Sequence, residues 1–207
     1  TTFGATMSPP VHPLRCRCGA LQGHVELNGS SNRMVCYCQD CQAFARFLGR
    51  TDKVLDAQGG SHVVQLAPHR IKFTQGAANL AVVRLSAQGM LRWYAACCRT
   101  PVGNTMTGRN MPFTGLLAQC LDTAPLEAAF GPVRASANTE SAIGEPKPRA
   151  FGLLGALLRI FGLVLGSRLS GRYKDTPFFT ASGTPVAEPM VLSAEERARL
   201  RPTSGHG

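Results

Sequence analysis

Three cysteines crowd into the stretch CYCQDCQ, which spans residues 36–42. Cys36, Cys38 and Cys41 are too many thiols for one disulfide and one too few for a tetrahedral site of four thiolates. The three either complete a structural site that is shared with other cysteines, or hold a zinc ion that keeps one coordination position open. An open position admits water or an incoming ligand, which is how catalytic zinc differs from structural zinc.

A second set of cysteines is split between two distant parts of the chain. Cys16 and Cys18 form a C-x-C pair in RCRCG, and Cys97 and Cys98 are adjacent in YAACCRTP. Because neither pair can hold an ion alone, we expect the two pairs to converge on one zinc ion. Neighbouring residues of an extended strand point to opposite faces, so the use of both Cys97 and Cys98 requires a bend, and Cys98 is the favoured ligand.

The composition favours a reducing compartment and anionic partners. The chain has 207 residues, eight cysteines and a formal net charge of +10. The C-x-C and C-x-x-C spacings are typical of metal chelation, and the chain opens without a basic, apolar signal peptide, which predicts a cytoplasmic protein with free thiols. The positive charge favours phosphates, carboxylates and acidic lipids, but it predicts no specific nucleic acid partner.

The elements that must position these cysteines are mostly strands. Residues 1–13 are small, polar and interrupted by proline, so we interpret them as a flexible leader. A β domain is expected over 14–120, followed by an extension over 121–207. Alternating or β-branched runs predict five strands, and a short helix is expected at 41–49. The predicted strands cover residues 23–27, 62–66, 70–74, 80–86 and 90–96.

The order of the cysteine motifs resembles one known family. C-x-C-G, then C-x-C-x-x-C, then a distal cysteine followed by T-P is similar to the glutathione-dependent formaldehyde-activating enzymes, a family that includes centromere protein V. The resemblance implies a mainly β, Mss4-like zinc-binding fold with short helices, here with a C-terminal helical extension. The family writes C-x-x-C-G-T-P at the distal motif, whereas this chain has Ala95 and Arg99 in place of the first cysteine and the glycine. Either Cys97 substitutes, or that site is incomplete.

The same resemblance implies a function. Cys16, Cys18 and Cys98 would hold a structural zinc ion, and Cys36, Cys38 and Cys41 would bind a second zinc ion or glutathione. The implied activity is that of a carbon-sulfur lyase acting on a thiol and aldehyde adduct at the three-cysteine site. Asp40 is the nearest carboxylate that could act as a base, and Phe44 or Phe47 would form an apolar wall. One alternative is a non-catalytic module, stabilised by zinc, that binds a protein, a nucleic acid or a membrane surface. Another is thiol redox chemistry or metal handling by the three-cysteine cluster.

The extension contains one strongly apolar segment. AFGLLGALLRIFGLVLGSRL, residues 150–169, carries Arg159 in its middle, and the uncharged runs on either side are too short to span a bilayer. We expect it to be helical and to pack against the domain or a second copy, while association with an anionic membrane surface stays open. A short helix at 123–131, a polar linker at 136–149 and a capping box in SAEERARL are also expected.

Overall fold

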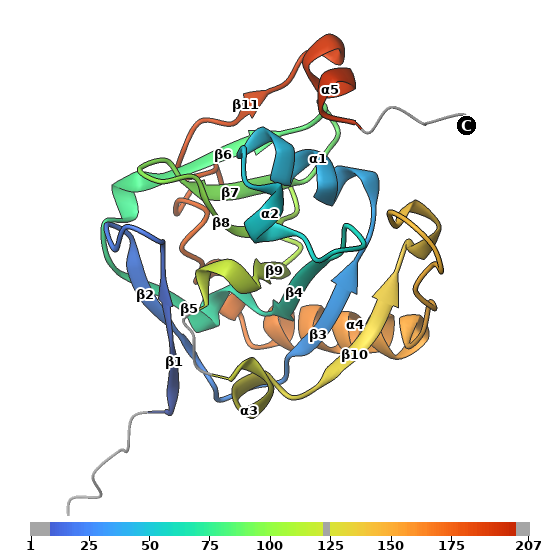
Figure 1. Cartoon of the computed structure of the whole chain (residues 1–207). Coiled ribbons are helices and arrows are strands. Elements are labelled where there is room, and N and C mark those ends of the chain that lie inside the picture. The colour runs from blue at the N-terminus through green and yellow to red at the C-terminus, as the bar shows by residue number, and fades with distance from the viewer. Residues whose placement is uncertain (1–8, 122–124, 202–207) are drawn as a thin grey trace, which may run out of the picture.

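The computed structural model describes residues 9–121 and 125–201, and two β-sheets dominate it (Figure 1). A three-stranded sheet has the order β1-β2-β5, and an eight-stranded sheet has the order β10-β3-β4-β9-β8-β7-β6-β11. The prediction of a mainly β protein with short helices is therefore confirmed. The strands are β1 (Val11–Arg15), β2 (Gln22–Glu26), β3 (Asn32–Cys36), β4 (Ser61–Leu66), β5 (Ile71–Gln75), β6 (Leu80–Arg84), β7 (Leu91–Ala95), β8 (Thr100–Thr105), β9 (Thr114–Leu117), β10 (Val133–Ala137) and β11 (Met190–Val191).

The described part of the chain also contains five α-helices. They are α1 (Gln39–Phe47), α2 (Thr51–Val54), α3 (Leu126–Phe130), α4 (Leu153–Leu169) and α5 (Ala194–Leu200). The first lies close to the helix expected at 41–49, and α5 begins with the predicted capping box, because the Ser193 side chain accepts from the Glu196 amide and the Glu196 carboxylate accepts from the Ser193 amide. Of the short helix expected at 123–131, the first two residues lie outside the described residues.

The extension builds both edges of the large sheet. β10 pairs with β3, and β11 pairs with β6, each in parallel register. These added strands cover hydrogen-bonding edges that would otherwise be free to pair with other chains. Residues 136 and 137, which were expected to begin the linker, are therefore the last two residues of β10. Residues 11–13, which were expected to belong to the flexible leader, lie in β1, which pairs with β2.

The main core lies between the sheets and takes side chains from most of the chain. Trp93 of β7 is wholly buried, and its indole nitrogen donates to the Thr105 hydroxyl at 2.9 Å. Phe178 and Phe179 of the extension join the same core, and the rings of Trp93 and Phe178 lie 5.1 Å apart. A smaller core forms where the inner face of α1 packs against β6 and the segment just before α5.

Candidate metal centres

The first cysteine pair lies in the loop between β1 and β2. The amide of Cys16 donates to the carbonyl of Leu21 at 2.9 Å, and the amide of Gly19 donates to the carbonyl of Cys16 at 3.0 Å. Gly19 has φ of 77°, a left-handed conformation that glycine adopts without strain. This tight turn brings the sulfurs of Cys16 and Cys18 to 3.5 Å from each other.

The second pair lies in the turn between β7 and β8, beyond the end of the strand. The amides of Cys98 and Arg99 both donate to the carbonyl of Ala95, at 3.4 Å and 2.8 Å, and Arg99 has φ of 55°. The chain is thus bent at the pair, so the objection that adjacent cysteines face opposite ways does not apply. Cys98 was the favoured ligand of the two, but the structure brings Cys97 to the group as well. The sulfur of Cys97 lies 3.7 Å from that of Cys16 and 3.4 Å from that of Cys18.

These four sulfurs have the spacing of a tetrahedral thiolate site. All lie within 4.8 Å of one another, and four of the separations between them run from 3.4 to 3.9 Å. A disulfide would bring two sulfurs to about 2.05 Å, whereas four thiolates at about 2.3 Å from one zinc ion would lie about 3.8 Å apart. Cys16, Cys18, Cys97 and Cys98, hereafter the four-cysteine group, could therefore hold a metal ion.

The surroundings shift the pKa values of Cys97 and Cys98 in opposite directions. Partial desolvation of Cys97, although this residue is exposed, and its hydrogen bonds to Cys18 and Cys16 raise the pKa of that thiol. Burial also opposes ionisation of Cys98, but hydrogen bonds from Thr100 and the backbone outweigh it and lower the pKa of Cys98 to about 6. The Thr100 hydroxyl lies 3.1 Å from that sulfur. The group is therefore ready to supply at least one thiolate ligand at neutral pH.

The three thiols of CYCQDCQ form a second, separate group. Cys36 ends β3, Cys38 is the N-cap residue of α1 and Cys41 lies in its first turn. Their sulfurs lie within 4.8 Å of one another and could hold a metal ion. No other cysteine, histidine or carboxylate among the described residues joins the group. We call Cys36, Cys38 and Cys41 the three-cysteine group.

Helix α1 separates the two groups. The guanidinium of Arg99, next to the four-cysteine group, donates to the carbonyl of Phe47 at the far end of α1, at 2.9 Å. The three-cysteine group lies at the beginning of the same helix, and nine residues of helix correspond to about 13 Å. The hypothesis that all seven cysteines form one shared structural site therefore does not fit the arrangement.

The helix start and nearby donors shape the three-cysteine group. The amide of Cys41 donates to the sulfur of Cys38 at 3.4 Å, and the side-chain amide of Asn138 donates to the sulfur of Cys36 at 3.4 Å. Hydrogen bonds from Cys38 and Cys41 lower the pKa of Cys36 to about 2, and the same contacts with Cys36 raise the pKa of Cys38 and Cys41. One thiolate shared among three sulfurs is the favoured state of this group.

A buried arginine lies beside this group. Arg92 of β7 is 5% exposed, and one of its guanidinium nitrogens lies 4.0 Å from the sulfur of Cys41. Its charge lowers the pKa of Cys41, against the larger opposing effects of the neighbouring thiols and burial. The guanidinium also lies over the Phe44 ring, 5.6 Å from its centroid. Phe44 is itself buried in the smaller core, so it is not available as an open apolar wall for a ligand.

Asp40 is held by two arginines. Its carboxylate lies 3.8 Å from Arg92 and 3.6 Å from Arg197 of α5. The evident effect of this carboxylate is to orient Arg92 beside the thiols. Sequence reasoning did not find Arg92, Arg197 or Asn138, because each comes to the site from a distant element and none belongs to a cysteine motif.

Cys120 and His24 lie outside both groups. Cys120 is a core thiol: it is fully buried, and its sulfur donates to the carbonyls of Val102 and Leu117. His24 of β2 joins neither group.

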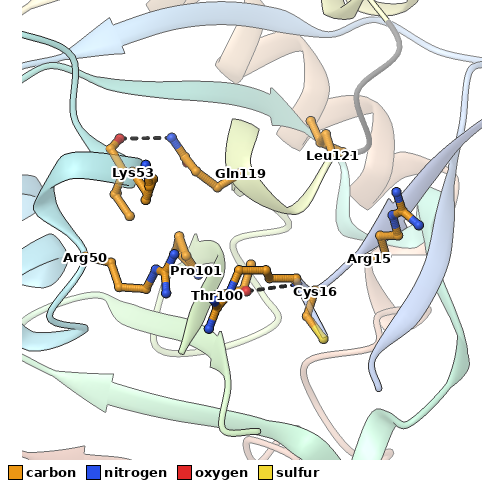
Figure 2. A pocket seen from close by; sticks show the side chains of 10 residues that line it. Arg15, Cys16, Arg50, Lys53, Thr100, Pro101, Gln119 and Leu121 are labelled. Atoms are coloured by element: carbon orange, nitrogen blue, oxygen red, sulfur yellow. Dashed lines mark hydrogen bonds between the residues drawn. The ribbon is translucent and has the colours of Figure 1, made fainter. Parts of the chain in front are cut away.

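A basic cleft borders the four-cysteine group (Figure 2). It has a volume of about 540 Å³, and its lining contains four cations and no carboxylate. Arg50 and Lys53 lie on one side and Arg15 on the other, with Cys16 and Thr100 on the same wall as Arg15. The cleft is lined by Arg15, Cys16, Arg17, Arg50, Lys53, Val54, Thr100, Pro101, Gln119 and Leu121.

The fold and the cysteine groups define a mainly β protein with two candidate metal centres. The sequence matches the Family of unknown function (DUF6151) over residues 7–190, and the chain belongs to that family. No curated protein matches the sequence. One solved structure, the crystal structure of a Rhodobacter sphaeroides protein that was a Northeast Structural Genomics target, is similar over 58% of this chain and 96% of that chain. Its sequence identity is 20% and its TM-score is 0.41.

Proposed function

We propose that the protein is a zinc-thiolate protein in which the four-cysteine group is structural and the three-cysteine group binds a small anionic thiol. The observation that carries the proposal is the difference between the two groups. One offers four sulfurs at tetrahedral spacing, and the other offers three sulfurs and no fourth protein ligand among the described residues. A site with one position left open is suited to binding a ligand as well as to stabilising the fold.

The chemistry of the three-cysteine group favours a thiol ligand. Zinc at this group would stabilise a bound sulfur as a thiolate, the form that acts as a nucleophile. Arg92 holds positive charge beside Cys41, and Asn138 donates to Cys36, so both stabilise negative charge on the sulfurs. The net charge of +10 favours a ligand that carries carboxylates. Glutathione has the required thiol and two carboxylates.

More specifically, we propose that a thiol adds to an aldehyde at this group. The motif order resembles the glutathione-dependent formaldehyde-activating enzymes, and the proposed reaction is reversible addition. The thiolate sulfur of glutathione attacks the carbonyl carbon of an aldehyde, a carbon-sulfur bond forms, and the resulting oxyanion takes a proton from solvent. Because Asp40 is paired with two arginines, we assign it to orienting Arg92 and not to proton transfer.

Metal analysis followed by calorimetry tests the proposal. We expect two zinc ions per wild-type chain and one per chain of the Cys38→Ala variant, since Cys38 belongs only to the three-cysteine group. Glutathione titrated into the zinc-loaded wild type should release heat that the variant does not. A matched control is Cys120→Ala, which removes a core thiol and should bind both zinc and glutathione like the wild type.

The outcomes separate the parts of the proposal. Two zinc ions without heat from millimolar glutathione would overturn thiol binding and leave zinc binding standing. Binding without consumption of an aldehyde, followed by NMR, would overturn only the lyase activity and favour the non-catalytic module. A wild-type protein that binds no zinc under reducing conditions would overturn the whole proposal.

A further inference from the structure

Helix α4 presents a continuous apolar stripe to solvent. Its members recur at helical spacing, so they share one face of the helix. They are Leu154 (71% exposed), Leu158 (63%), Phe161 (66%), Leu165 (44%) and Leu169 (80%). The segment was expected to pack against the domain or a second copy, and most of its large apolar side chains do not pack against the domain. A contiguous apolar patch that is exposed on a protein surface marks a site of interaction.

The opposite face of α4 already has its partner. Ala156 and Ser167 are buried, and the helix packs against β10 and β4 of the large sheet. In Figure 1 the helix passes behind β3 and β10. Ile160 and Leu163 on this inner face are half-buried. The stripe is thus not needed to attach the helix, and the sheet fixes it in an outward orientation.

The charges around the stripe are all of one sign. The segment 146–174 contains six lysines and arginines and no aspartate or glutamate. At 100° per residue, Arg159 and Arg168 fall to either side of the stripe and not within it. Both are exposed, as are Arg172 and Lys174 beyond the end of the helix. Cations that flank an apolar face are the pattern of helices lying at the surface of an anionic membrane.

We propose that α4 docks this protein flat onto an anionic lipid surface, with the stripe (Leu154, Leu158, Phe161, Leu165 and Leu169) inserted at the level of the acyl chains and the flanking cations among the headgroups. The helix does not cross the bilayer: among the described residues no helix is long and apolar enough to do so. The stripe spans about 23 Å along the helix axis, and its axis would lie parallel to the membrane.

Charge distinguishes a lipid surface from a second copy of the chain. In a symmetric dimer each α4 would face the same segment of its partner, so six cations would meet six cations with no carboxylate from that segment to pair with them. An anionic headgroup layer neutralises the same cations. The proposal is independent of the cysteine groups, because α4 contains no cysteine.

Co-flotation with lipid vesicles tests the proposal on the full chain. Vesicles of phosphatidylglycerol and phosphatidylcholine should carry the wild type to the top of a density gradient, and vesicles of phosphatidylcholine alone should carry much less. Because Leu158 and Phe161 are exposed, Leu158→Ser and Phe161→Ser should each lower partitioning about tenfold without changing the unfolding midpoint. The double variant Arg168→Gln and Arg172→Gln should weaken binding to anionic vesicles by about thirtyfold.

Two controls make the test specific. Val186→Ser removes an equally apolar side chain, 46% exposed, from a segment outside α4, and should bind vesicles like the wild type. Cys36→Ser should also bind like the wild type, so loss of the proposed thiol site and loss of membrane docking are distinguishable. Equal flotation of wild type and Phe161→Ser would overturn the proposal. The proposal would also be overturned if the wild type did not float and formed a dimer in solution that Phe161→Ser converts to a monomer. That result would assign the stripe to a second copy of the chain.

Discussion

Removal of metal should destabilise the protein mainly through the four-cysteine group. Cys16 and Cys97 are 81 positions apart, so a metal that joins them closes a long loop of the unfolded chain. Treated as a cross-link, closure of such a loop contributes about 4.5 kcal/mol to the free energy of unfolding. Cys36 and Cys41 are five positions apart, and the same relation gives about 2 kcal/mol for the three-cysteine group.

Two variants isolate these contributions. In Cys36→Ala only the four-cysteine group is complete, so a chelator should lower the free energy of unfolding by about 4.5 kcal/mol. In the double variant Cys97→Ala and Cys98→Ala only the three-cysteine group is complete, and the chelator should lower it by about 2 kcal/mol. Cys97 is exposed and Cys98 half-buried, so the double variant removes ligands with little loss of packing. Cys16 is 1% exposed and would confound the two effects.

Urea unfolding in the presence of zinc or of chelator, under reducing conditions, measures these differences. Cys120→Ala is the control for the loss of a thiol: it should be destabilised by the same amount with and without chelator, since Cys120 is no ligand. Equal chelator dependence in Cys36→Ala and in the double variant would refute the reasoning, because it would mean that all seven cysteines stabilise the fold as one cluster.

Three further predictions concern stability. Burial, followed by the charge of Arg172, lowers the pKa of His69 to about 4. Because the unfolded histidine takes up a proton near pH 6.5, the metal-free protein should lose stability as the pH falls from 6.5 to 4. His69→Gln should make the urea midpoint of unfolding less dependent on pH over this range. Trp93→Ala should lower the free energy of unfolding by about 3–5 kcal/mol in denaturant titrations, because it empties a fully buried position. Arg99→Gly should unfold at higher urea than Arg99→Ala, by about 1 kcal/mol, because only alanine carries a Cβ at φ of 55°.

The local part of the fold followed from sequence periodicity. Strands such as β4 and β7 alternate or contain β-branched and aromatic residues, and turn residues bound them, so their positions were predictable to within a residue or two. The strands β1, β3, β8, β9, β10 and β11 were not predicted. Of these, β10 and β11 are short, and each is a strand only because it pairs in parallel with an element 100 or more positions away.

The cysteine groups were predictable from ligand chemistry, and their surroundings were not. Convergence of the two distant pairs follows from the need for four ligands, which no single pair supplies. The participation of Cys97 depends on the left-handed backbone at Arg99, which no propensity of arginine signals. The resemblance did carry a clue, since the related motif has glycine at that position, the residue best suited to positive φ.

The distribution of arginines near the two groups is explained by the charge that each proposed metal centre would carry. A zinc ion with four thiolates has a net charge of −2, and with three thiolates a net charge of −1. Arg15 and Arg17 line the cleft that borders the four-cysteine group, where they are exposed and screened by solvent. At the three-cysteine group the positive charge of Arg92 is buried, where the dielectric constant is lower. Arg92 therefore attracts the negative metal centre more strongly than an exposed arginine would.

Arg92→Met should therefore weaken zinc binding at the three-cysteine group, whereas Arg17→Met should leave the zinc content of both groups unchanged. Metal titrations of the two variants that gave the opposite order would contradict this electrostatic assignment.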